Sequence, residues 1–129
     1  MKIGNSKETF RWVLLRHTGA PNDIRGVHFD LLLEDKKFCR TWRLSDIPLL
    51  DGPYVDSFYI VSHSLDWLDI EQKVLSGNRG VASRIKKGNF FNSLPIIEKS
   101  FINIAMSWED VESNLLIDEH GCRISRKKN

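Results

Sequence analysis

The sequence has few of the features that mark disulfide-rich or metal-thiolate proteins. Only two of its 129 residues are cysteines, Cys39 and Cys122, and they lie far apart without a C-x-x-C pair. This scarcity argues against a disulfide framework and against a zinc site built from cysteines. We expect both thiols to be reduced, as in a cytoplasmic protein.

Long hydrophobic runs and a dominant charge are also absent. No stretch approaches the ~18 consecutive apolar residues of a membrane span. The N-terminal decapeptide MKIGNSKETF lacks the apolar core of a secretory signal, so we expect a cytoplasmic protein with no membrane partner. Nineteen basic and seventeen acidic residues give a net charge of +2, which neither indicates nor excludes a nucleic-acid partner.

The length and patterning are those of one small β domain. A chain of 129 residues with 41% hydrophobic and 28% charged residues suits a single domain over residues 1–129. Turn signals recur at strand-length spacing, which favours a small antiparallel β-sandwich or barrel over an α/β fold. Strands are predicted at 10–17, 28–34, 38–44, 57–64, 81–86, 101–108, 115–117 and 122–126. Segment 66–75 fits either a short helix or a strand.

The most informative segment is HFDLLLE, residues 28–34. Alternate side chains of a strand point to opposite faces, so this segment predicts one buried face and one face that lines a groove. The buried face comprises Phe29, Leu31 and Leu33. The groove face comprises His28, Asp30, Leu32 and Glu34.

His28 and Asp30 form the candidate core of a metal site. Two positions apart on a strand, their Cα atoms lie about 6.5–7 Å apart, so both side chains can reach one cation. Mixed nitrogen and oxygen ligands suit Mn, Fe or Zn. The strand-terminal His17 and His63 are available as a third ligand. The alternative interpretation is a surface histidine beside a hydrogen-bonded aspartate, and His120, in a turn, has the pattern of a structural residue.

An ordered set of motifs resembles the 3′-phosphoesterase domain of bacterial DNA ligase D. The set covers about residues 10–91 and comprises Arg16-His17, HFDLLLE at 28–34, Thr41-Trp42, HSLDW at 63–67, Glu71 and SGNRG at 76–80. The resemblance implies a small closed β-barrel that removes 3′-terminal phosphates and ribonucleotides during DNA end repair. It also implies a manganese ion at His17, His28 and Asp30, a catalytic His63 at the scissile phosphate, and DNA repair proteins as partners.

Several phosphate-binding residues of that family are replaced in this chain. The family's arginine two positions after the H-x-D is Leu32, its tyrosine is Trp67, and its lysine is nearest to Asp46. The loop between His17 and His28 is also longer than the family's. We therefore predict substitute substrate-binding residues, namely Arg25, Arg43, Trp67 and Arg79, although each arginine also fits an ordinary surface position.

Three functions fit these observations. The first is a metal-dependent phosphoesterase acting on nucleic-acid 3′ ends, with Mn²⁺ or another divalent ion such as Zn²⁺. The second is a non-catalytic nucleic-acid-binding or scaffolding barrel, in which Trp12, Trp42, Trp67 and Trp108 offer stacking surfaces. The third is a non-haem iron oxygenase, which also uses two histidines and a carboxylate; His63 lies early in the chain for the distal histidine of that class.

Overall fold

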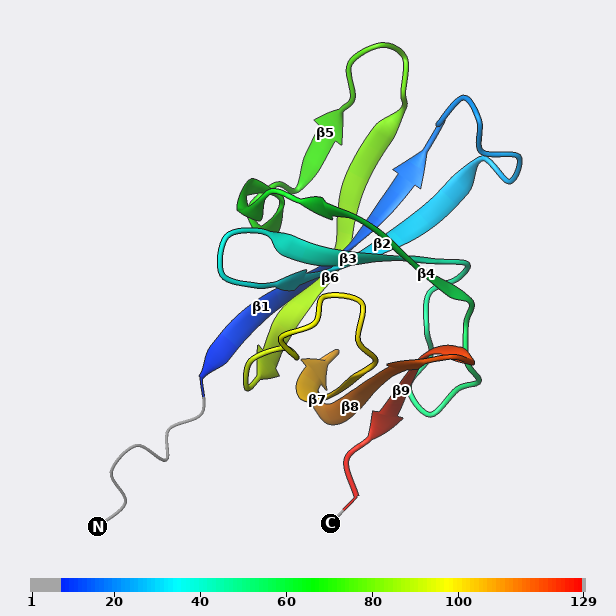
Figure 1. Cartoon of the computed structure of the whole chain (residues 1–129). Helices are drawn as coiled ribbons and strands as arrows, with labels where there is room; N and C mark the ends of the chain where they lie inside the picture. The colour runs from blue at the N-terminus through cyan, green and yellow to red at the C-terminus, as the bar shows by residue number, and fades with distance from the viewer. Residues whose placement is uncertain (1–7, 129) are drawn as a thin grey trace.

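The computed structural model describes residues 8–128, which form nine β-strands and one short 3₁₀ helix (Figure 1). Within this range there is no α-helix, and no helix is long and apolar enough to cross a membrane. Residues 1–7 lie outside the described part. The prediction that the N-terminus carries no secretory signal concerns these residues and stays a prediction. The elements are β1 (Thr9–Thr18), β2 (Val27–Glu34), β3 (Cys39–Leu44), β4 (Ser57–His63), η1 (Leu65–Leu68), β5 (Gln72–Val74), β6 (Val81–Phe91), β7 (Ile102–Trp108), β8 (Val111–Asp118) and β9 (Gly121–Arg126).

All strands belong to one antiparallel sheet with the order β4-β3-β2-β1-β6-β7-β8-β9, and β5 pairs with β6. The sheet curls until its two ends approach each other (Figure 1). There the segment before β4 meets β9 through two isolated bridges, Val55 with Cys122 and Leu50 with Ile124. The predicted all-β, antiparallel barrel-like fold is confirmed, as a curled half-barrel closed by bridges rather than by a continuous ladder.

The interior of the curl holds the main hydrophobic core. Trp12 stacks on Trp108 with ring centroids 5.0 Å apart, and both side chains are buried. Leu31 and Leu33 are buried in the same core, as predicted, whereas Phe29 is only partly buried. Three of the four tryptophans, Trp12, Trp42 and Trp108, are core residues with at most 4% exposure, so they offer no stacking surface to a nucleic acid.

The opposite face of β1–β3 carries a second, smaller cluster, which we call the outer cluster. It is covered by η1, which packs on β1 and β2. Leu32 is fully buried in it, which corrects the prediction that Leu32 lines a groove. An arginine at this position would be buried under Leu68 rather than face a phosphate. The outer cluster comprises Val13, Leu15, Leu32, Cys39 and Leu68, flanked by Leu65 and Trp67.

Two strands extend further than their sequence pattern predicts. β6 continues to Phe91 past Gly88, where an added Cβ would lie 2.8 Å from Trp12 Nε1, so only glycine lets the strand pass this ring. β8 starts at Val111 because Glu109 and Asp110 form a two-residue hairpin turn with positive φ of 50° and 64°. Glu-Asp is an unusual sequence for such a turn, which typically uses Asn-Gly or Asp-Gly.

Candidate metal centre and groove

Three side chains from β1 and β2 converge on one point. His17 lies directly opposite His28 in the β1–β2 register, and Asp30 follows two positions later on the same face. His17 Nδ1 is 3.0 Å from His28 Nε2, and His28 Nε2 is 3.6 Å from Asp30 Oδ2. One ligand atom from each residue lies within 4.8 Å of the other two. The structure thus brings together the three residues predicted as metal ligands.

These separations match those of ligands around one small cation. With metal–ligand bonds of about 2.1 Å, adjacent ligand atoms lie about 3.0 Å apart in an octahedral site and about 3.4 Å apart in a tetrahedral one. The observed distances of 3.0 and 3.6 Å are close to both values. With all three ligand atoms within 4.8 Å of one another, the residues are compatible with one divalent ion.

The outward-facing nitrogens of both imidazoles are bound to groups that only accept hydrogen bonds. His17 Nε2 is 2.6 Å from the carbonyl oxygen of Arg79, and His28 Nδ1 is 3.0 Å from Asp23 Oδ2. Each ring therefore carries its hydrogen on the outer nitrogen. The inner nitrogens then face each other at 3.0 Å with lone pairs, whose mutual repulsion a cation between them would remove. A divalent metal ion coordinated by both nitrogens would supply that charge.

Sequence patterns did not single out Asp23, which lies in the loop between β1 and β2. Its Oδ1 accepts a hydrogen bond from the Arg25 backbone N–H at 3.1 Å, while Oδ2 accepts from His28. The hydrogen bond from His28 lowers the pKa of the Asp23 carboxyl below its usual range. The only sequence signal was an acidic residue five positions before a candidate ligand histidine, which is a common spacing in polar loops.

Asp30 is buried and forms an ion pair with a basic neighbour. Only 4% of the residue is exposed, and Arg43 lies opposite it in the β2–β3 register. Arg43 Nε donates to Asp30 Oδ1 at 3.1 Å, so one carboxylate oxygen binds Arg43 and the other faces His28. The Arg43 side chain is 43% exposed, which leaves its terminal amino groups accessible to an anion.

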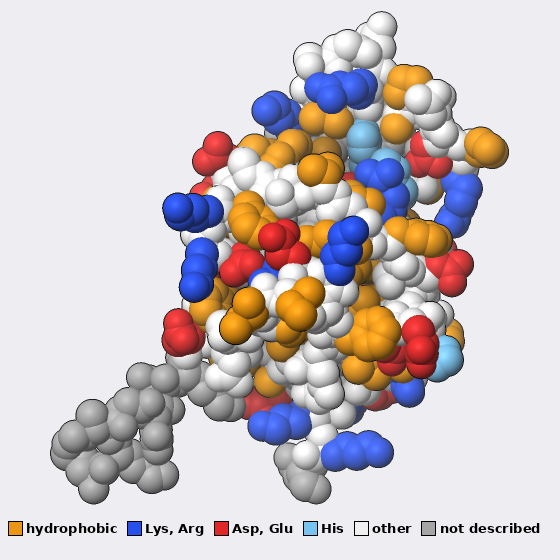
Figure 2. Space-filling view, in the orientation of Figure 1, with side chains coloured by type: hydrophobic (Ala, Val, Ile, Leu, Met, Phe, Trp, Pro, Cys, Tyr) orange, Lys and Arg blue, Asp and Glu red, His pale blue; other side chains and the backbone are white. Residues whose placement is uncertain are grey.

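A groove of about 650 Å³ extends from His17 and Asp30 between the sheet edges formed by β4 and β5. A second cavity of about 510 Å³ lies on the side of the β1–β2 loop and shares three groove residues, His17, Arg43 and Arg79. Figure 2 shows histidine side chains at the surface beside basic side chains, in the upper part of the view. The polar side chains of the groove are His17, Asp30, Arg43, His63, Lys73, Ser76 and Arg79.

His63, predicted as the catalytic residue, lines this groove from the end of β4. Its Nδ1 is 3.1 Å from Thr41 Oγ1 and 3.2 Å from the Val61 carbonyl oxygen. Thr41 Oγ1 itself donates to the Cys39 carbonyl, so both neighbours of His63 Nδ1 accept. The hydrogen of the neutral ring therefore sits on Nδ1, which leaves Nε2 as an acceptor. Burial lowers the pKa of His63 and favours this neutral form.

The three predicted substitute arginines have different surroundings. Arg25 lines the loop-side cavity, but its guanidinium donates to the Ser45 carbonyl at 2.7 Å and pairs with Asp46. Arg79 donates from its guanidinium to Ser76 within its own turn, and its carbonyl is the acceptor of His17. Arg43 is the one of the three whose guanidinium contacts a candidate metal ligand.

Trp67 and Lys73 form the far wall of the groove. Trp67 lies on η1, with its ring edge-on to His63 at 6.2 Å, and Lys73 Nζ lies 5.6 Å from the centre of the Trp67 ring. Trp67, predicted as a substrate-binding residue, lines this groove. Lys73 was missed because the secondary structure of segment 66–75 was ambiguous, so the side to which Lys73 points was undetermined.

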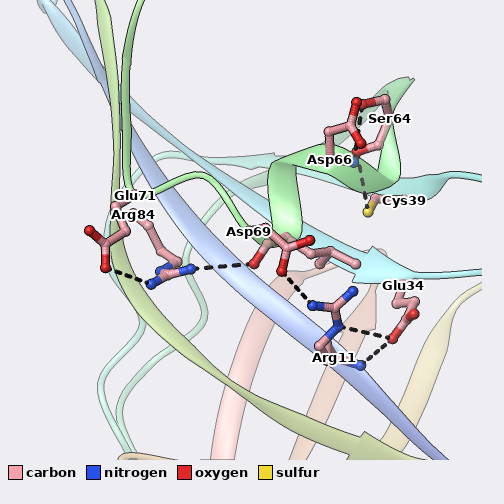
Figure 3. Close-up of polar contacts among 9 residues, drawn as sticks. Arg11, Glu34, Cys39, Ser64, Asp66, Asp69, Glu71 and Arg84 are labelled. Carbon is pink, nitrogen blue, oxygen red and sulfur yellow. Dashed lines mark hydrogen bonds and ion pairs between the residues drawn. The ribbon is translucent and has the colours of Figure 1, made fainter.

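Ion pairs hold this wall against the sheet (Figure 3). Arg11, whose backbone N–H donates to Glu34, pairs with Asp69 at 2.8 Å just after η1. Arg84 on β6 donates to the Leu68 carbonyl at 3.3 Å and pairs with Glu71 before β5. These contacts join η1 and β5 to β1 and β6, and so position the far wall relative to the histidines.

Comparison with known proteins gives no family assignment. No protein-family model matches the chain, and no curated protein matches it. The resemblance to the ligase D phosphoesterase domain stays a prediction. The functional assignment therefore depends on the geometry of the candidate metal centre and the groove.

Proposed function

We propose that this protein is a metal-dependent phosphoesterase that acts on the 3′ ends of nucleic acids. The observation that carries the proposal is the pair of inward-facing imidazole nitrogens 3.0 Å apart, with the Asp30 carboxylate beside them. His17, His28 and Asp30 would hold the ion, with Mn²⁺ favoured over Zn²⁺ by the resemblance. When bound, such an ion polarises a phosphoryl oxygen and lowers the pKa of a bound water.

The residues of the groove supply the remaining functions. Arg43 is fixed at Nε by Asp30 and directs exposed amino groups to phosphate oxygens. It replaces, from the neighbouring strand, the arginine that the family carries at the position of the buried Leu32. His63 Nε2 would accept a proton from a water that attacks phosphorus, because Nδ1 is held as the donor by Val61 and Thr41. As the bond from phosphorus to the 3′-oxygen breaks, His63 would return that proton to the leaving 3′-oxygen.

The far wall suits a nucleotide. The Trp67 ring lines the groove with Lys73 Nζ over it, so a base that stacks there would displace Lys73 toward a phosphate. Lys73 and Arg79 supply positive charge along the groove. These features favour a phosphorylated substrate over the small organic substrates of an iron oxygenase. DNA repair proteins as partners follow from the resemblance alone.

A non-catalytic binding barrel is the second candidate. The burial of Trp12, Trp42 and Trp108 leaves Trp67 as the one tryptophan that lines the groove, so broad stacking on nucleic acid is disfavoured. The observation in favour of this candidate is the placement of the Arg25 and Arg79 guanidiniums, which hydrogen-bond within their own surroundings instead of completing a phosphate clamp.

Activity on defined 3′ ends tests the proposal. Primers ending in a 3′-phosphate or a single 3′-ribonucleotide are incubated with the protein, with and without Mn²⁺. We expect turnover that requires Mn²⁺, that is abolished in His28→Ala and Asp30→Ala, and that is slowed by about 10²–10⁴-fold in His63→Ala. His120→Ala is the matched control, since His120 is exposed and lines neither cavity.

Two results would contradict the proposal. A wild-type protein that binds divalent ions yet leaves both 3′ ends intact would favour the non-catalytic barrel. A wild-type protein whose turnover is unchanged in His28→Ala and Asp30→Ala would place the chemistry elsewhere.

A further inference from the structure

We infer that Asp23, in the loop between β1 and β2, is a positioning residue that determines which nitrogen of His28 faces His17 and Asp30. The inference concerns the same centre as the proposed function, and its consequence for metal affinity rests on that proposal. The placement of the imidazole hydrogen does not depend on a metal and is tested separately.

The loop uses both carboxylate oxygens of Asp23. Oδ1 accepts from the Arg25 backbone N–H at 3.1 Å, and Oδ2 accepts from His28 Nδ1 at 3.0 Å. The side chains of Asp23 and His28 are 16% and 11% exposed, so water competes little for this contact. The Asp23 carboxylate is therefore fixed in place and directed at one nitrogen.

The backbone of the loop is tied down on both sides of Asp23. The Asp23 N–H donates to the Ala20 carbonyl at 3.1 Å, and the Gly26 N–H donates to the Asp23 carbonyl at 3.0 Å. Arg25 then links the loop to the segment after β3 through Ser45 and Asp46. Such anchoring of a loop is what a positioning role requires, because a mobile carboxylate would not bias the ring.

The hydrogen bond to Asp23 selects between two arrangements of the neutral imidazole. With Asp23 present, the His28 hydrogen sits on Nδ1, and the Nε2 lone pair points to the cation site. Without it, the hydrogen can move to Nε2 and be donated to His17 Nδ1, 3.0 Å away. That second arrangement ties the two histidines together and blocks the nitrogen that would bind a metal. Loss of such an outer partner typically lowers metal affinity by about 10–100-fold.

The direct test is long-range ¹H–¹⁵N NMR of the imidazoles in the metal-free protein at pH 9, above the ordinary imidazole range. We expect the His28 hydrogen on Nδ1 in wild type and a shift toward Nε2 in Asp23→Ala. Asp23→Asn retains an oxygen acceptor and should restore the Nδ1 form. Asp46→Ala removes only the exposed 3.4 Å partner of Arg25 and leaves the Arg25–Ser45 contact and the Asp23 carboxylate in place, so it should keep the wild-type signature. An unchanged spectrum in Asp23→Ala, or an equal change in Asp46→Ala, would overturn the inference.

Mn²⁺ titration by calorimetry provides the second arm, with denaturant unfolding to show that each variant is folded. We expect Asp23→Ala to bind Mn²⁺ about 10–100-fold more weakly than wild type, and Asp23→Asn to fall in between. Equal affinity in wild type and Asp23→Ala would overturn the inference while leaving the proposed function intact. If wild type bound no divalent ion, the proposed function would fail, and the NMR result would still decide the role of Asp23.

Discussion

At the scale of single residues, His63 and Cys39 show how burial and hydrogen bonding set protonation. His63 is partly buried, with Nδ1 directed at two acceptors, and it lines the groove that His17 and Asp30 begin. Cys39, its neighbour in the β3–β4 register, is fully buried in the outer cluster. These two groups titrate in different pH ranges, so each yields a separate prediction.

His63 should make the protein less stable in mild acid. Its pKa is lowered in the folded protein, chiefly by burial, whereas the unfolded chain takes up the proton at about 6.5. The unfolded state therefore binds more protons as the pH falls below about 6.5, and the stability contribution of His63 is lost toward its folded pKa. Urea unfolding of wild type and His63→Gln between pH 5 and 8 should show a smaller acid-induced loss in the variant. Parallel profiles would contradict this prediction.

The two cysteines should be nearly inert in the folded protein. Both thiols are free and buried, and burial raises the pKa of each to about 12. Because the thiolate is the reactive species, alkylation at pH 8 should be slow in buffer and fast in denaturant. Mass spectrometry of time points with iodoacetamide checks this. Rapid labelling of the native protein at either cysteine would show that the outer cluster or the β9 edge opens readily.

The sequence predicted some site residues and not others for local reasons. His28 and Asp30 were predictable because a strand's two-residue period places them on one face, and the resemblance selected His17 over His63 as the third ligand. Leu32 shares that face, but its exposure depends on η1, which packs on β2 from a distant part of the chain. The role of Asp23 depends on the path of a loop, and no periodicity describes that path.

At the scale of elements, one face of β2 packs into the main core and the other face carries two residues of the candidate metal centre. Leu31 is buried in the core beside Leu33 and Trp42, and Leu31→Ala should cost about 2–5 kcal/mol of unfolding free energy. The matched control is Val61→Ala on β4, where the side chain is 79% exposed and the change should stay within about 0.5 kcal/mol. Urea melts of both variants measure this. Equal losses would show that β2 is not a core strand.

The turn between β5 and β6 positions His17 through its backbone. Gly80 has a φ of 93°, and a Cβ there would overlap the Thr18 carbonyl oxygen, whereas a Cβ at Gly77 would meet no atom within 4 Å. Gly80→Ala should displace the adjacent Arg79 carbonyl from His17 Nε2, lowering both stability and Mn²⁺ affinity. Gly77→Ala should cost only the left-handed backbone penalty of about 1 kcal/mol and leave affinity unchanged. Indistinguishable variants would contradict this positioning role.

The strand pattern was predictable where side chains alternate and failed where backbone geometry decides. The predicted bounds of β1, β2, β3 and β7 agree with the structure within about two residues. The limits of β6 and β8 were missed because Gly88 and the Glu109-Asp110 turn interrupt the sequence pattern without interrupting the strands.

At the scale of the whole molecule, the curled sheet separates stability from the proposed chemistry. The inner face holds the main core, and the outer face of β1–β3 presents the candidate ligands beside the outer cluster. The groove lies between two sheet edges, β4 and β5, so its walls come from segments far apart in the chain. Such an arrangement allows substitutions in the site without loss of the core.

Anomalous diffraction from crystals soaked in Mn²⁺ tests the central claim most directly. We predict one strong anomalous peak between β1 and β2, about 2.0–2.3 Å from His17 Nδ1, His28 Nε2 and an Asp30 carboxylate oxygen. The same soak of Asp30→Ala crystals should show a weaker peak or none at this position. A wild-type crystal with no peak there, with His17 and His28 still in direct contact, would contradict the metal centre and the function built on it.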